Sequence, residues 1–296
     1  MILSYGVRLV CLSLAVFLLV HTLISIVASL IGPAALRLAE RIRPRNAARL
    51  LLALRLMPAA VSIFIVAAFC IPSYLSLETE AGGEQIGLLC AGAAIAAAAM
   101  WAVSATNLVR ALIRSARFTR HCERTGAPVI MLTGILRPRL VISQAVRRAL
   151  SASQLEAARR HEQAHRNAHD NFKRCLIAGT PRMPGFAALE RGWSRFSEWA
   201  ADDESVAANP TRALCLADAL VRVARLGAIP AEVSLLGDGR DLAVRVDRLL
   251  HPRVYGPPRG RWFAMATMAG VVAVGGLLAL QQPLESAHEW LERLAH

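Results

Sequence analysis

Residues 160–170 read Arg-His-Glu-Gln-Ala-His-Arg-Asn-Ala-His-Asp, a stretch that contains the pattern HExxH. His161 and His165 are four residues apart, so on a helix both imidazoles lie on one face and can reach a single metal ion. Glu162 lies about 100° round the helix, close enough to act on a water at the metal without binding the metal itself. The stretch therefore predicts a helical metal site that needs a third ligand.

Two residues compete for the place of that third ligand. His169 is the nearer in sequence, but three ligands in a row on one straight helix would spread along about 12 Å and could not converge. His169 is therefore expected at the surface or behind the ligands. Glu198, on the next predicted helix, is the better candidate. Asp202 follows one turn later, where it could hydrogen-bond a ligand histidine and fix its tautomer.

Local signals set the expected limits of the elements around the motif. Ser153 and Glu156 have the spacing of a capping box, so the HExxH helix is predicted to begin near Gln154 and to run to about Ile177. Further helices are predicted at 186–207, 211–227 and 238–250. Residues 128–133 and 139–143 are short β-type runs on either side of a turn, and they predict a β-hairpin at the edge of any sheet because it contains Pro138.

The cysteines do not add a second kind of site. None of the six has a CxxC spacing, and three lie in long apolar runs. This pattern argues against a disulfide framework and against a cysteine zinc site.

The apolar runs predict a membrane protein. The chain has 296 residues, of which 55% are hydrophobic, and stretches of about 20 apolar residues are long enough to cross a bilayer. Four such spans are predicted, at about 8–31, 50–72, 86–108 and 262–281. The expected fold is a mainly α membrane protein with three spans in 1–108, a mostly helical zinc peptidase domain in 109–258, and the fourth span with a short tail in 259–296.

The charge distribution predicts how these spans are oriented. The net charge is +13, with arginines concentrated in 32–49 and after residue 109, whereas 73–85 holds only acidic charges. The positive-inside rule then places 32–49 and 109–258 in the cytoplasm and the other connections outside, as expected for a multi-pass protein of the inner (plasma) membrane. The positive charge is thus explained by topology and by contact with anionic lipid in the bilayer, and no direct nucleic-acid binding is expected. Arg55, near the end of the second span, is expected to extend to the interface.

Beyond the motif itself, the order HExxHxxxxD, then ExxAD, preceded by Gly-x-x-x-Pro-Arg, resembles a known group. It is similar to the BlaR/MecR-type antirepressor membrane metallopeptidases, relatives of HtpX and of the CAAX prenyl proteases. The resemblance covers about 125–207. The matching residues are Gly134, Pro138, Arg139, His161, Glu162, His165, Asp170, Glu198, Ala201 and Asp202.

The resemblance implies roles for these residues. It implies a gluzincin-like site with Glu162 as general base and acid, and with Zn²⁺ held by His161, His165 and Glu198. Asp170 and Asp202 would stand behind the ligands. The hairpin residues Gly134, Pro138 and Arg139 are candidates for a strand that holds an extended substrate. The donor that stabilises the oxyanion is left open among Arg195, Arg212 and His251.

The expected function is that of an integral membrane zinc endopeptidase acting on a protein or peptide in the cytoplasm. By analogy with the resembled family, the substrate would be a transcriptional repressor, in regulated proteolysis. Only 283–296 follow the last predicted span, so a sensor domain for β-lactams is not expected. The alternatives are an HtpX-like quality-control protease for membrane proteins and a non-catalytic membrane scaffold that retains the motif.

Overall fold

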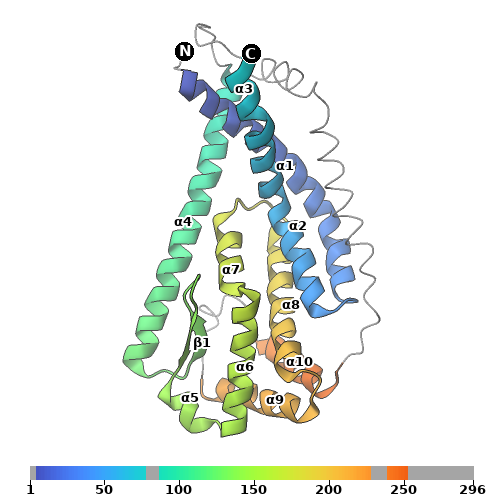
Figure 1. The fold of residues 1–296 in the computed structure, drawn as a ribbon, viewed down its shortest axis with the longest axis vertical. Coiled ribbons are helices and arrows are strands. Elements are labelled where there is room, and N and C mark those ends of the chain that lie inside the picture. The colour runs from blue at the N-terminus through green and yellow to red at the C-terminus, as the bar shows by residue number, and fades with distance from the viewer. Residues whose placement is uncertain (1–4, 78–86, 228–238, 253–296) are drawn as a thin grey trace.

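Three long helices form the frame of the molecule (Figure 1). The computed structural model describes residues 5–77, 87–227 and 239–252. Within these ranges, three stretches are long and apolar enough to cross a membrane, Tyr5–Ala39, Pro44–Ser76 and Leu88–Cys122. The first stretch is helix α1 (Tyr5–Ala39). The second combines α2 (Pro44–Ile65), η1 (Val66–Cys70) and most of α3 (Ile71–Leu77). The third makes up most of α4 (Leu88–Thr125). The fourth predicted span, 262–281, lies outside the described residues.

Helix α4 is longer than a bilayer is thick. Its 38 residues extend about 57 Å at 1.5 Å per residue, against about 30 Å of hydrocarbon. The predicted domain boundary at 108 lies inside this continuous helix. The helix ends at Gly126, which has the left-handed conformation (φ 64°) favourable to glycine at a C-terminus. One rigid element therefore runs from the apolar region to the β-hairpin.

The predicted β-hairpin is confirmed. Strands β1 (Ile130–Thr133) and β2 (Arg139–Ile142) are antiparallel, with Ile130 opposite Ile142. The turn begins at Gly134 with φ 97°, where a Cβ would lie 3.3 Å from the carbonyl oxygen of Arg137. Helix α5 (Gln144–Ala149) follows, with Ser143 as its N-cap.

The HExxH helix begins earlier than predicted. Helix α6 (Ala152–Ala168) has a capping box made by Ser151 and Gln154, not by Ser153 and Glu156. The Ser151 hydroxyl accepts from the backbone N–H of Gln154 at 3.3 Å, and the Gln154 side chain accepts from the N–H of Ser151 at 2.8 Å. Gln154 is also buried and donates to Asp218 of α9 (Pro210–Arg225). This tertiary contact selects Ser151 as the cap, whereas Glu156 pairs on the exposed face with Arg160.

The helix does not continue to Ile177, so that prediction was wrong. It stops at His169, which adopts the left-handed conformation (φ 56°, ψ 37°), and a separate helix, α7 (Asp170–Gly179), follows. Neither Gly nor Pro stands at this break. Helices α8 (Phe186–Val206) and α10 (Gly239–Leu250) complete the described chain, close to the predicted bounds.

Helix α8 packs against α1 and α2. Small residues of the two long helices form a surface for the larger side chains of α8, with Ala28, Ala35, Ala39, Ala47, Ala48 and Leu51 facing Leu189, Trp193, Phe196 and Trp199. The approach is closest at Gly192, where a Cβ would lie only 2.6 Å from Leu36 Cδ2. The apolar frame thus holds the helix that carries Glu198.

Arg55 of α2 does not extend to the interface, contrary to expectation. Its side chain is 1% exposed and donates to Glu190 Oε1 of α8 at 2.8 Å. The guanidinium also donates to Thr180 Oγ1 at 3.2 Å, and to the carbonyl oxygens of Ile177 at 3.1 Å and Thr180 at 3.3 Å. It therefore joins α2 to α8 and satisfies carbonyl groups at the C-terminal end of α7.

We expect Arg55→Met to lower the free energy of unfolding by about 3 kcal/mol, because it leaves buried carbonyl groups without their donor and removes one of the two arginines that pair with Glu190. The measurement is unfolding of the full chain in mixed detergent micelles. Arg45→Met is the matched control, since the Arg45 side chain is 63% exposed and lies 3.8 Å from Glu204; such a pair contributes less than about 1 kcal/mol. An equal loss in the two variants would contradict the role given to Arg55.

Candidate metal centre

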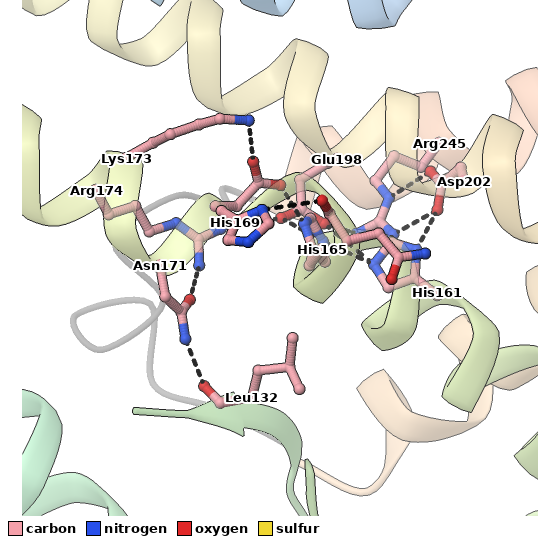
Figure 2. A network of polar contacts seen from close by, with 12 residues as sticks. Leu132, His161, His165, His169, Asn171, Lys173, Arg174, Glu198, Asp202 and Arg245 are labelled. Carbon is pink, nitrogen blue, oxygen red and sulfur yellow. Dashed lines mark hydrogen bonds and ion pairs between the residues drawn. The ribbon is translucent and has the colours of Figure 1, made fainter. Parts of the chain in front are cut away.

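The Nε2 atoms of the two histidines of α6 point at the same place. His161 and His165 are 6% and 7% exposed, and their Nε2 atoms lie 3.2 Å apart. This is the arrangement that residues one helical turn apart allow when both side chains face the same neighbour. That neighbour is α8, which packs along α6 (Figure 2).

Glu198 of α8 completes the group. Its Oε2 lies 3.5 Å from His161 Nε2 and its Oε1 lies 3.4 Å from His165 Nε2. Donors bound at 2.0–2.1 Å to a tetrahedral zinc ion lie about 3.4 Å from one another. Among the described residues, the donor set of His161, His165 and Glu198 is the group that could hold a metal ion, and its spacings fit zinc.

A carboxylate lies close to the Nδ1 atom of each histidine. His165 Nδ1 lies 2.7 Å from Asp170 Oδ2, and Asp170 is 3% exposed. The left-handed turn at His169 brings Asp170 to this position, which a continuous helix would not do. His161 Nδ1 lies 3.0 Å from Asp202 Oδ1, at an angle outside hydrogen-bond geometry. A carboxylate hydrogen-bonded to Nδ1, as Asp170 is to His165, fixes the ring orientation and directs Nε2 towards a metal. His161 Nε2 also lies 3.3 Å from a terminal nitrogen of Arg245.

His169 is not part of the group. Its side chain is exposed, and its ring contacts the carbonyl oxygen of Asn167 at 3.1 Å. Its structural contribution is the break between α6 and α7.

Two arginines that the sequence did not single out contact the group. Arg245 of α10 lies 3.1 Å from Glu198 Oε2 and 2.8 Å from Asp202 Oδ1 through its two terminal nitrogens. Arg174 of α7 lies 3.5 Å from Glu198 Oε1. Because Arg245 reaches the site from more than 40 residues beyond Asp202, no local spacing in the sequence could identify it.

The arginine and histidine candidates for the oxyanion donor lie elsewhere. Arg195 pairs with Glu40 at 3.1 Å and stacks near Phe196. His251 pairs with Asp247 on the exposed surface, and Arg212 is exposed in the first turn of α9. In the part of the chain that the structure describes, Arg174 and Arg245 are instead the cationic side chains beside the donor set.

Burial and charge shift the acid–base properties of the group. Burial raises the pKa of Glu162, although the neighbouring histidines oppose this effect. For His165, burial lowers the pKa, but the Glu198 charge and the Asp170 contact outweigh it and raise the pKa to about 10. For Asp202, burial raises the pKa, but the charge of Arg245 outweighs it and lowers the pKa to about 2. Because a metal binds the unprotonated imidazole, metal binding at neutral pH has to release a proton from His165.

The group opens on a cleft of 2720 Å³ between α4, the hairpin and α6–α7. Glu162 lines this cleft together with the three donors, and so does Gly134 of the predicted substrate strand. Pro138 and Arg139 belong to the turn and to β2 and are not among the lining residues. A polypeptide in the cleft would therefore meet β1 and the donor set together.

We expect Asp170→Asn to weaken Zn²⁺ binding by about 10- to 100-fold, because the amide cannot orient His165 as the carboxylate does. The measurement is competition with a chelating dye, using the full chain in detergent. Asp247→Asn is the control, since Asp247 is 73% exposed and contacts only His251 among the interactions described. Equal affinities for wild type and Asp170→Asn would contradict the orienting role.

Comparison with known proteins assigns no family: no family model, curated protein or solved structure matches this chain. The chemistry of the site therefore has to be inferred from its own residues.

Proposed function

We propose that the protein is an integral membrane zinc endopeptidase. The observation that carries the proposal is the convergence of His161 Nε2, His165 Nε2 and a Glu198 carboxylate at zinc spacing, with Glu162 in the same cleft. Three protein ligands with one position open for water are typical of catalytic zinc, whereas structural zinc sites have four protein ligands.

The choice of zinc rests on Glu162 as well as on the ligands. Two histidines and one carboxylate also suit non-haem iron(II). An acid that follows the first histidine directly is the arrangement of zinc peptidases, where it serves as general base. Metal content of the purified protein separates the two ions.

A zinc ion in this site would supply Lewis acidity toward water and toward a peptide carbonyl. Glu162 then takes the proton of the attacking water and returns it to the leaving amine. Burial raises the pKa of Glu162, which makes its carboxylate a better proton acceptor for the first of these steps. Asp170 orients the His165 imidazole through a hydrogen bond, and the Asp202 carboxylate lies 3.0 Å from His161 Nδ1. Arg245 pairs with both Asp202 and Glu198.

The membrane frame supports a role close to the bilayer. Three described helices can span it, and the arginine distribution favours a cytoplasmic site. The proposed role is regulated proteolysis, with a transcriptional repressor as the substrate suggested by the family resemblance. Quality control of membrane proteins is the alternative role. A broad set of substrates, found by comparing the proteomes of cells with active and inactive enzyme, would favour it.

We expect the purified full chain to contain about one Zn²⁺ and to cleave dye-labelled β-casein, an unstructured polypeptide. Glu162→Gln keeps the metal but lowers cleavage at least about 100-fold, because proton transfer is lost. The control is Glu156→Gln on the same helix, whose side chain is 52% exposed and pairs with Arg160; it leaves cleavage unchanged.

Two outcomes would reject the proposal in different ways. A protein that binds zinc but cleaves neither itself nor casein at any rate above Glu162→Gln would be a metal-containing scaffold. A protein without stoichiometric zinc would refute the metal site itself.

A further inference from the structure

Strand β1 and the metal group line the same cleft. The Ser143 N–H donates to the carbonyl oxygen of Val129 at 2.9 Å, and the Val129 N–H donates to the Ser143 hydroxyl at 3.0 Å. Main-chain groups of successive residues in a strand point to opposite sides. The main-chain groups of Val129 therefore point towards the β2 side of the hairpin. Those of Leu132 point away from β2, on the free edge of β1.

A side chain already occupies this free edge. The Asn171 amide nitrogen donates to the carbonyl oxygens of Leu132 at 3.2 Å and Gly134 at 2.8 Å. Leu132 lies in β1, and Gly134 is the first residue after it. The two acceptors are two residues apart, which is the spacing at which an added strand places its own donors. The Asn171 amide thus takes the place that main-chain N–H groups of an extended polypeptide would take.

Asn171 also belongs to the surroundings of the metal group (Figure 2). It follows Asp170, the partner of His165, in the first turn of α7. The Arg174 guanidinium donates to Asn171 Oδ1 at 3.4 Å and to Glu198 Oε1 at 3.5 Å. A polar chain therefore connects the free edge of β1 with a proposed zinc ligand.

We propose that the free edge of β1 is the docking edge for an extended substrate polypeptide, and that Asn171 occupies this edge until the substrate main chain displaces it. The inference rests on the proposed peptidase function and adds to it a residue that limits substrate affinity. The number of hydrogen bonds to the two carbonyl groups is unchanged by this exchange, because main-chain N–H groups of the substrate replace the two N–H donors of the Asn171 amide. The hydrogen bonds of Asn171 nevertheless have to be broken first, so the side chain competes with the substrate.

The competing interpretation is that Asn171 is a structural link that holds the hairpin against α7. The two interpretations predict opposite effects of removing the amide. A competitor, once removed, leaves the edge open and strengthens binding. A structural link, once removed, lets the strand move from the cleft and weakens binding.

The test measures binding of dye-labelled β-casein to the full chain in detergent by fluorescence anisotropy. All variants carry Glu162→Gln, so that cleavage does not interfere. We expect Asn171→Ala to lower the Kd about five- to tenfold, since each net hydrogen bond changes an equilibrium by about fivefold. Asn171→Leu, of similar shape but without a donor, changes the Kd in the same direction. Asn167→Ala is the matched control, because the exposed Asn167 amide donates to Glu204 at 3.2 Å, away from the hairpin, and it leaves the Kd unchanged.

An unchanged or higher Kd in both Asn171 variants, with zinc content preserved, would overturn the inference. So would the absence of casein binding in every variant, or casein binding that leaves the hydrogen exchange of residues 130–134 unchanged. Since no cleavage is measured, the result does not depend on activity. A wild-type protein that binds casein at this edge but does not cleave it would refute the peptidase function alone.

Discussion

The contacts of one buried arginine connect the long apolar helices with the candidate metal site. Arg55 lies in a helix long and apolar enough to cross a membrane, yet its partners are Glu190 of α8 and the C-terminal carbonyl groups of α7. Burying a guanidinium is costly unless each donor is paired, so α2, α7 and α8 have to adopt this relative position. Helix α7 carries Asp170 and α8 carries Glu198, so the same contacts fix two elements of the metal group.

The metal group depends on two further constraints of the backbone. The left-handed residue His169 turns the chain so that Asp170 returns to His165, and Gly192 lets α8 come close to Leu36 and Leu51. Neither position provides a ligand. Both determine where ligands and their partners lie, as is common where a scaffold holds a site with high precision.

Local features were predictable from the sequence because they depend on near neighbours in the chain. The face shared by His161 and His165, the hairpin and the three long apolar helices all follow from spacing and composition. The break at His169 was not predictable, since neither Gly nor Pro stands there to mark it. Ser151 and Ser153 both have the spacing of a capping residue, and only the packing of Gln154 against α9 selects Ser151 as the cap of α6. Arg245 was missed and Arg55 was placed at the interface because their partners are distant in sequence, and a chain with so many arginines does not mark the two that are buried.

The most direct test of the central claim is zinc K-edge X-ray absorption on the purified full chain loaded with one equivalent of Zn²⁺. A site made by two imidazoles and the Glu198 carboxylate predicts only nitrogen and oxygen neighbours at about 2.0–2.1 Å, with the outer-ring scattering of two histidines. The same measurement on Glu198→Ala predicts loss of stoichiometric zinc or a changed first shell. Sulfur neighbours at about 2.3 Å, or a spectrum that Glu198→Ala leaves unaltered, would contradict the site described for this protein.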